Sequence, residues 1–331
     1  MTAPEITEPV RWGLLGASGI AERSFLPALE VAGGGTPLVI GARDGARAAR
    51  FASDLGVAES VEGYRAVLQD ARVEAVYVAL PNGLHAEWAI AALEAGKAVF
   101  CEKPMCATPE ETEAAIRAAR DAGRPLWEAF VFPFHAQFAA VQKLLADGAV
   151  GELLEIQSDF HFMVRNPANI RLARDLDGGA LNDVGCYPVR IALELFGAGH
   201  TDAWATAVWG GHDVDVDTQG SLGFPGGRRL LLTCGMRRAY DTFTRLLGTA
   251  GQIQLTNPFH PGRGDSYTVL TDGEPPRTLD AGAAEPSFTG MIRHIQNVLR
   301  GGEAPRQLAL DTSLASARAL HDLHQSMAAT R

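Results

Sequence analysis

A short apolar run followed by a glycine-rich turn stands near the start of the chain, where residues 10–21 read VRWGLLGASGIA. The run Val10–Leu15 is typical of a buried β-strand, and a helical pattern follows the turn. Gly16 permits a tight bend and Ala21 allows close helix packing, although Ser18 stands where a second glycine is usual. The alternative is a strand-to-helix turn that uses glycine only for backbone freedom. We predict a dinucleotide site in which a helix N-terminus faces the pyrophosphate and the contacts come from Gly16, Ala17, Ser18, Gly19 and Ile20.

Working outward from this turn, apolar runs alternate with helical patterns over the first 129 residues. The next runs are Pro37–Ile40, Glu74–Leu80, Ala98–Cys101 and Pro125–Trp127. The run Glu74–Leu80 is almost wholly apolar, as expected for a strand that is buried on both faces. Because the connections are short and helical, the pattern predicts a parallel, doubly wound α/β sheet over residues 8–129.

The pattern changes near Phe130, where several β-type segments follow one another with few helices between them. Strands that are joined by turns rather than helices favour an antiparallel sheet. We therefore predict a second α/β domain over residues 130–331, with an open, mainly antiparallel sheet built from Leu153–Val164, Ala203–Trp209, Gly220–Phe224, Arg229–Gly235, Thr242–Leu247 and Ser266–Leu270.

The composition excludes several classes of protein. The chain has 331 residues, 47% of them hydrophobic, so extensive disorder is not expected. Its 29 basic and 39 acidic residues give a net charge of −10, and without a basic block we expect no nucleic-acid partner. We also expect no membrane span, no signal peptide and no metal site, since the nine histidines form no known ligand pattern. Four cysteines without CxxC spacing favour a reduced, cytoplasmic enzyme.

The end of the second predicted strand bears on the choice of cofactor. An acidic residue at this place would bind the adenosine ribose of NAD, whereas the chain reads Gly41-Ala42-Arg43-Asp44. Arg43 can pair with a 2′-phosphate, which favours NADP, although use of NAD stays possible. The alternative is that Arg43 is a solvated residue and that Asp44 only caps the next helix.

Lys103 follows the strand Ala98–Cys101 within the sequence Glu102-Lys103-Pro104. Ligands bind at the carboxyl ends of parallel strands, so this lysine is expected to face the cofactor. An X-Pro bond can be cis, and we predict a cis Lys103–Pro104 bond that directs the ammonium group toward the nicotinamide.

A second cluster reads GGALNDVGCYP over residues 178–188. Asp183 and Tyr187 are four residues apart, so on a helix both project from one face. Hydride transfer to or from a carbinol needs a group that moves the hydroxyl proton. A free tyrosine has a pKa near 10, which a nearby ammonium such as that of Lys103 lowers toward the working pH. The alternative is that Asp183 caps a helix and Tyr187 is a half-buried core residue.

Four motifs together resemble one known family. They are GASGIA (16–21), ALPNGLHAEWAIAALEAGKAVFCEKP (79–104), EAFVFPFHAQF (128–138) and GGALNDVGCYPV (178–189). In this order they resemble the glucose–fructose oxidoreductase/inositol dehydrogenase (Gfo/Idh/MocA) family, over most of the chain. The resemblance implies an N-terminal Rossmann domain and a C-terminal domain whose open sheet forms a homodimer or homotetramer interface.

The resemblance also implies roles for individual residues. Lys103 matches the catalytic lysine, and Tyr187 matches the acid/base position of the branch that includes NADP-dependent aldose (D-xylose) 1-dehydrogenases and dihydrodiol dehydrogenases. Asp183 matches the aspartate one turn earlier, which would orient the lysine or a substrate hydroxyl. Further cofactor contacts are expected from Leu80, Pro81, Asn82, His85, Glu102 and Lys103.

Substrate contacts are less closely defined by the sequence. His161 and Arg165 lie at the end of a long predicted strand, and Arg171 lies in the loop before the catalytic helix. We expect Arg171 to bind a sugar hydroxyl or a phosphate, and Arg165 to face the substrate cleft. His161 is a candidate for substrate contact, with a plain sheet-surface role as the favoured alternative. Pro133 stands where the relatives often have a basic residue. Asn182 stands where an apolar residue is usual, and we expect Asn182 to add either a polar contact or only a helix cap.

The resulting hypothesis is an NADP(H)-preferring oxidoreductase that moves hydride between nicotinamide and a carbinol or carbonyl carbon of a sugar or cyclic polyol. The closest branch is the aldose 1-dehydrogenases. The alternative enzyme is a ketosugar reductase that acts on a nucleotide-linked deoxysugar. The alternative from another class is a dinucleotide-binding regulatory or scaffold protein that has lost catalysis.

Overall fold

The computed structural model describes residues 8–197, 199–211, 213–305 and 310–329, which divide into two units. Unit 1 holds the chain up to Cys106, then Glu110–Val131 and Glu285–Leu310. Unit 2 holds Ala107–Pro109, Phe132–Ala284 and the segment that begins at Asp311. The boundary expected at residues 129–130 therefore falls two residues later, and residues 285–310 belong to unit 1 instead of the second domain.

Unit 1 is built on a six-stranded sheet with the order β3-β2-β1-β4-β5-β6. Every neighbouring pair of strands is parallel. This is the strand order of dinucleotide-binding folds, and it confirms the predicted doubly wound sheet. The strands are β1 (Val10–Leu15), β2 (Gly35–Ala42), β3 (Glu59–Glu62), β4 (Ala75–Val78), β5 (Ala98–Cys101) and β6 (Leu126–Glu128).

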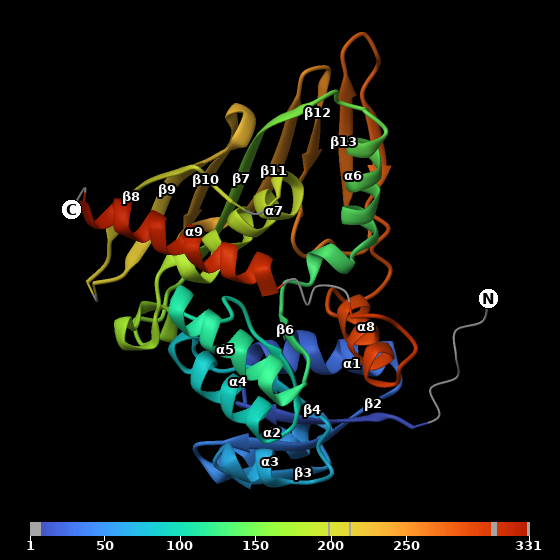
Figure 1. Cartoon of the computed structure of the whole chain (residues 1–331), viewed down its shortest axis with the longest axis vertical. Coiled ribbons are helices and arrows are strands. Elements are labelled where there is room, and N and C mark those ends of the chain that lie inside the picture. The colour runs from blue at the N-terminus through green and yellow to red at the C-terminus, as the bar shows by residue number, and fades with distance from the viewer. Residues whose placement is uncertain (1–7, 198, 212, 306–309, 330–331) are drawn as a thin grey trace. The chain divides into compact units, whose positions relative to one another are not determined.

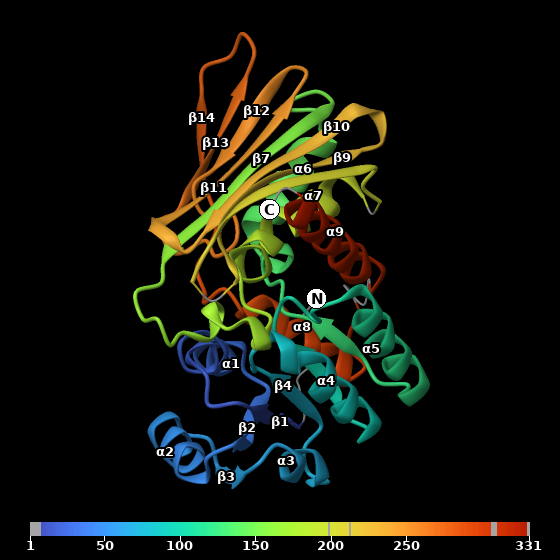
Figure 2. The same cartoon turned by 90° about the vertical axis from the view of Figure 1, so that its left-hand side faces the viewer.

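Helices lie on both faces of this sheet, as short crossover connections between parallel strands require (Figure 2). Helix α2, for example, has a polar cap at its start and a glycine at its end. The Asp44 side chain accepts hydrogen bonds from two backbone N–H groups at the start of α2, and Gly56, with φ +71°, ends that helix. The helices are α1 (Leu26–Ala32), α2 (Gly45–Leu55), α3 (Arg65–Gln69), α4 (His85–Glu94), α5 (Pro109–Ala122) and α8 (Thr289–Leu299).

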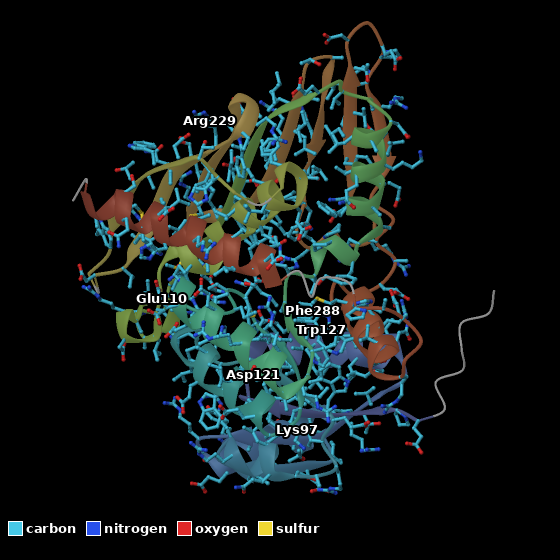
Figure 3. All side chains as sticks on the ribbon, viewed as in Figure 1. Lys97, Glu110, Asp121, Trp127, Arg229 and Phe288 are labelled. Atoms are coloured by element: carbon cyan, nitrogen blue, oxygen red, sulfur yellow. The ribbon has the colours of Figure 1, made fainter. Side chains whose placement is uncertain are left out.

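An aromatic core explains why α8 belongs to unit 1. Trp12, Phe25, Tyr77 and Phe100 pack with ring centroids 4.2–6.5 Å apart. Phe288, labelled in Figure 3, adds an edge contact to Phe100 at 6.1 Å. The helix that follows, α8, buries one apolar face against α1, and this packing holds it in unit 1.

Unit 2 is built on an eight-stranded sheet with the order β14-β13-β12-β11-β7-β10-β9-β8. Only β7 and β10 pair in parallel, so the sheet is mainly antiparallel, as predicted. The strands are β7 (Leu153–Met163), β8 (Asp202–Trp209), β9 (Asp215–Phe224), β10 (Arg228–Gly235), β11 (Arg237–Gly248), β12 (Gly251–Leu255), β13 (Ser266–Thr271) and β14 (Arg277–Asp280).

Helices α6 (Ala136–Ala146), α7 (Cys186–Phe196) and α9 (Leu310–Ala329) cover one face of this sheet (Figures 1 and 2). Ile156, Leu230 and Leu232 point toward the helices and are buried. Alternate residues, such as Leu231, point to the opposite face, because side chains alternate along a strand. Among the helices that the structure describes in unit 2, none covers the opposite face of the sheet.

Candidate active site

Unit 1 presents the glycine turn at the carboxyl end of β1. Gly16 has φ +102°, and a Cβ there would lie 2.7 Å from the Ala79 carbonyl oxygen, so only glycine fits. A helical segment begins at Gly19, as predicted, and continues through a π-helical turn, Ala21–Phe25, into α1. The Ser18 hydroxyl accepts a hydrogen bond from the backbone N–H of Ala21 at 3.2 Å. Ser18, which departs from the usual glycine, therefore serves as the helix cap.

Two arginines lie near the end of β2. Arg47 donates a hydrogen bond to the Ala17 carbonyl of the glycine turn at 2.6 Å. Burial raises the pKa of the Tyr64 phenol, while the positive charges of Arg43 and Arg47 act in the opposite direction. Arg47 was missed from the sequence, although its spacing of four residues from Arg43 was the available signal.

Lys103 lies in a turn directly after β5. The Lys103–Pro104 bond is cis, as predicted. The preceding Glu102 is buried, and its carboxylate accepts a hydrogen bond from the Tyr77 hydroxyl at 2.6 Å. Glu102 thus fixes the turn from inside, while the half-buried Lys103 follows it at the carboxyl end of the strand.

His85 supports two turns from the interior of unit 1. Its side chain is fully buried, with Nδ1 2.8 Å from the Pro104 carbonyl oxygen and Nε2 2.8 Å from that of Leu80. Burial lowers the pKa of His85, against the opposing effect of both carbonyls. Glu128 adds a further support by accepting a hydrogen bond from Met105 N at 2.8 Å. The His85 ring is therefore placed to position the turns that carry Leu80 and Lys103.

These features fit a bound dinucleotide. Gly16 has no room for a side chain, and a Cβ on Gly19 would lie 2.6 Å from an Arg23 guanidinium nitrogen, so a cationic group rests against the helix N-terminus. Such a cradle suits a pyrophosphate. The expected cofactor residues all lie at or just beyond the carboxyl ends of β1, β2, β4 and β5, namely Gly16, Ala17, Ser18, Gly19, Ile20, Arg43, Leu80, Pro81, Asn82, His85, Glu102 and Lys103.

In unit 2, the helical segment that carries Tyr187 begins before α7. A π-helical turn, Leu181–Gly185, precedes α7. Asp215 is 2% exposed, and its carboxylate accepts hydrogen bonds from Leu181 N at 2.8 Å and from the Thr218 hydroxyl at 2.7 Å. Gly179 has φ +117°, and a Cβ there would collide with the Asp215 carboxylate. A buried carboxylate from β9 therefore caps this helix, a contact that no local sequence signal announces.

Tyr187 lies in a pocket of aromatic rings. Its ring centroid is 5.3 Å from that of Phe160 and 5.0 Å from that of Phe259. Its hydroxyl lies 3.1 Å from Nε2 of His260, a residue that the sequence did not single out. The apolar body of the side chain is thus packed, while the oxygen is held in a polar contact.

Asp183 and Asn182 have different partners in unit 2. Asp183 is 7% exposed and accepts a hydrogen bond from Arg171 Nε at 2.7 Å. The structure therefore places Arg171, expected to bind substrate, on the carboxylate of a predicted catalytic residue. Asn182 does make a polar contact, because its Oδ1 lies 2.9 Å from Nε2 of His324 on α9.

His161 lies on the sheet face opposite to Tyr187. The neighbouring Phe160 contacts Tyr187, and side chains alternate along β7. His161 Nε2 is 2.8 Å from the Thr233 hydroxyl, and burial lowers the pKa of His161, with a smaller contribution from Arg238. This environment favours the sheet-surface role over substrate binding. Arg165 is exposed in the loop that follows β7.

A cavity of about 640 Å³ opens in the same loop region, lined by Pro167, Ala168, Asn169, Leu172, Ala173, Arg174 and Asp175. Among the residues that the structure describes, no group of three or more His, Cys, Asp or Glu side chains could hold a metal ion. Within the same described residues, no helix has both the length and the apolar character that a membrane span requires.

Comparison with known proteins agrees with this arrangement. Residues 10–130 match a family described as "Oxidoreductase family, NAD-binding Rossmann fold", and residues 138–254 match the GFO/IDH/MocA C-terminal domain. A dTDP-3,4-didehydro-2,6-dideoxy-alpha-D-glucose 3-reductase from Streptomyces violaceoruber is 37% identical over 87% of each chain. A D-xylose 1-dehydrogenase (NADP(+)) from Haloferax volcanii is 34% identical over 89% of this chain and 90% of its own.

Among solved structures, a 3-ketoreductase from Actinomadura kijaniata in complex with NADP and TDP-benzene has a TM-score of 0.89. It is 32% identical and covers 96% of this chain and 98% of its own. Both sequence domains match in order, and these relatives match over 87–98% of their own length. The chain therefore belongs to the GFO/IDH/MocA family and is an oxidoreductase with a Rossmann domain.

Proposed function

We propose that the enzyme is an NADP-dependent oxidoreductase that interconverts a carbinol and a carbonyl carbon of a sugar or cyclic polyol, as an aldose 1-dehydrogenase does. Tyr187 moves the proton of the substrate oxygen. Lys103 holds that oxygen and stabilises the phenolate with its positive charge. Asp183, held by Arg171, orients these groups or a neighbouring hydroxyl.

NADP, when bound, exchanges a hydride with the substrate carbon through its nicotinamide ring. The residues of the protein bind the cofactor and move the proton of the substrate oxygen. The glycine turn and the N-terminus of its helix hold the pyrophosphate, and Arg43 with Arg47 binds the 2′-phosphate. In the oxidising direction, Tyr187 as phenolate accepts the hydroxyl proton, and in the reducing direction it donates a proton to the carbonyl oxygen.

The setting of the Tyr187 hydroxyl carries the proposal. A tyrosine that served only as a core residue would need no second ionisable group on its oxygen. Here the ring is fixed by Phe160 and Phe259, and the oxygen lies 3.1 Å from His260 Nε2. A fixed phenol with a polar partner is suited to proton transfer, and a pure dinucleotide-binding scaffold has no need of one.

A ketosugar linked to a nucleotide is the second candidate substrate. Relatives named as dTDP-sugar 3-reductases are 34–39% identical to this chain, which matches or exceeds the 34% of the D-xylose dehydrogenase. The loop that lines the cavity of about 640 Å³ carries Arg174, a cation that could meet a diphosphate. The same residues, Tyr187 and Lys103, would act on either substrate.

Purified enzyme assayed at 340 nm with both classes of substrate tests the proposal. Free aldoses and cyclic polyols are supplied with NADP⁺, and nucleotide-linked ketosugars are supplied with NADPH. Turnover of free aldoses at kcat/KM well above that for nucleotide sugars supports the first candidate, and the reverse order supports the second. Absence of turnover with every member of both classes, by an enzyme that still binds NADP, contradicts the proposed activity.

Replacing Arg43 by alanine is expected to weaken NADP binding about 10-fold to 100-fold, because a charge-assisted hydrogen bond contributes roughly 1.5–3 kcal/mol. The affinity of the variant for NAD, which lacks the 2′-phosphate, should change little. Titration calorimetry with both cofactors measures the difference. The matched control is Arg50→Ala, an exposed arginine on α2. Equal losses for NADP and NAD in the Arg43 variant would show that Arg43 makes no 2′-phosphate contact.

We further propose that two or four copies associate through the open face of the unit 2 sheet. Trp204, Ser221 and Leu231 are in register across β8, β9 and β10, so their side chains share one face. Trp204 is 50% exposed and Leu231 is 38% exposed. Large apolar side chains gathered on an uncovered face favour association.

Sedimentation velocity is expected to give a mass of two or four times the 35.2 kDa chain. Trp204→Glu should shift the population toward single chains, because a charge would be buried without a partner. Ile170→Glu, which alters an equally exposed apolar residue in a loop, should leave the mass unchanged. A wild-type mass of a single chain at micromolar concentration would contradict association through this sheet.

The cytoplasm is the proposed location. The four cysteines, Cys101, Cys106, Cys186 and Cys234, have buried side chains and form no disulfide with one another. Burial raises the pKa of the Cys101 and Cys234 thiols, which disfavours the reactive thiolate. Unpaired thiols are common in reducing compartments, where disulfides are rare.

A further inference from the structure

His260 lies in the loop that follows β12, 73 residues beyond the tyrosine that it contacts. The motifs of the sequence assign it no role. Its Nε2 is 3.1 Å from the Tyr187 hydroxyl oxygen, within hydrogen-bond distance. The two rings meet edge to face, with centroids 5.3 Å apart and an interplanar angle of 79°. The Nε2 atom of the imidazole therefore faces the phenol oxygen of Tyr187.

The loop holds His260 in this position through its own hydrogen bonds. Asn257 Nδ2 donates to the His260 carbonyl oxygen at 2.7 Å, and Asn257 Oδ1 accepts from His260 N at 3.3 Å. The Asp265 carboxylate accepts from Asn257 Nδ2 at 2.9 Å and from Gly262 N at 2.7 Å. Because these hydrogen bonds hold the backbone of His260, little ordering of the loop is needed before the imidazole can act.

Burial shows why Tyr187 needs such a partner. The tyrosine is 6% exposed, and Phe160 and Phe259 cover its ring. A phenol that releases a proton in each turnover must regain one, and bulk water has little access to it. His260 is only partly buried, so it can exchange protons with solvent. The imidazole thus stands between the enclosed hydroxyl and water.

We propose that His260 is the proton relay of Tyr187, an inference that rests on the proposed oxidoreductase function. In the reducing direction, the Tyr187 O–H bond breaks as its proton moves to the substrate oxygen, while the substrate carbon receives hydride from the reduced dinucleotide. A proton from His260 Nε2 then forms a new O–H bond on Tyr187. The imidazole regains a proton from water, so the substrate gains one proton that the solvent supplies. In the oxidising direction, each proton moves the opposite way.

Substitution of His260 tests the relay. His260→Gln is expected to lower kcat by about 10-fold to 100-fold, part of the roughly 10²–10⁴-fold that acid–base catalysis supplies, with KM changed by less than about twofold. His260→Ala should recover kcat in proportion to added imidazole, because a free imidazole can occupy the vacated space and donate a proton. His200→Gln is the matched control, since His200 pairs with Asp322 on α9 and not with Tyr187. Its kcat should stay at the wild-type value.

A kcat for His260→Gln equal to that of the wild type would overturn the relay. A loss of kcat in His260→Ala that imidazole does not restore would also overturn it, because a structural role cannot be rescued by a small base. The contact itself is measured without turnover, by NMR titration of histidine-labelled protein. Tyr187→Phe should shift the midpoint of the His260 ring titration and leave that of His200 unchanged. An unchanged His260 midpoint refutes the pair, whereas a shifted midpoint in a protein that turns over no sugar refutes only the proposed function.

Discussion

Tyr187→Phe is expected to reduce kcat by roughly 10²–10⁴-fold, the usual contribution of a positioned general acid or base. The substitution removes one oxygen and leaves the ring between Phe160 and Phe259, so the fold should be kept. NADP affinity should change little, because the cofactor residues lie in unit 1. Stopped-flow measurement of single-turnover rates with saturating cofactor gives the size of the loss.

Tyr267→Phe is the matched control for this prediction. Tyr267 is 4% exposed on β13, so its loss of a hydroxyl tests the effect of the same chemical change elsewhere in unit 2. Near-normal turnover in Tyr187→Phe would reject Tyr187 as the acid/base group. A similar loss in both variants would point to a general effect on the fold.

Lys103→Met is expected to cost roughly 10²–10³ in kcat, as does the removal of one preorganised group that stabilises developing charge. The methionine keeps most of the apolar stem of the lysine but removes its ammonium. The cis turn and the Glu102–Tyr77 hydrogen bond do not involve the ammonium group, so the backbone of the turn should be kept. Steady-state kinetics over a range of sugar concentrations separates the loss in kcat from a change in KM.

The control is Lys143→Met, which removes a surface lysine of α6 that is paired with Asp147. Its side chain is 74% exposed, and its kinetics should match those of the wild type. Because Lys103 and Tyr187 are proposed to act as one unit, the double variant should lose much less than the product of the two single losses. Fully multiplicative losses would contradict their joint action.

The first sheet was predicted well because its signals are local. β1 and β5 have the predicted bounds, since parallel strands covered on both faces are continuous apolar runs. The glycine turn, the Asp44 cap and the cis Lys103–Pro104 bond likewise depend on residues that are neighbours in sequence. Strand β3, with the sequence ESVE at the sheet edge, was missed because its exposed residues carry no apolar pattern.

The second unit was predicted less completely. Strands β12 and β14 were missed, and β9 and β11 are longer than expected, because a sheet with one open face tolerates polar residues. Arg171 was expected to face substrate, but its guanidinium binds Asp183. His161, a candidate for substrate contact with the sheet-surface role as the favoured alternative, bonds Thr233 on the sheet face opposite to Phe160, because side chains alternate along a strand.

The sequence by itself determined the doubly wound sheet and the glycine turn, and it named Lys103, Asp183 and Tyr187 as candidate site residues, because each of these features depends on spacing within a few residues. Only the tertiary structure decided that α8 returns to unit 1, that Asp215 caps the helix of Tyr187, and that His260 meets the Tyr187 hydroxyl. The Asp215–Leu181 contact joins residues 34 positions apart, and the His260–Tyr187 contact joins residues 73 positions apart. The contact of Phe288, which precedes α8, with Phe100 spans more than 180 positions. Their formation depends on how the whole core packs, and no local pattern of residues records it.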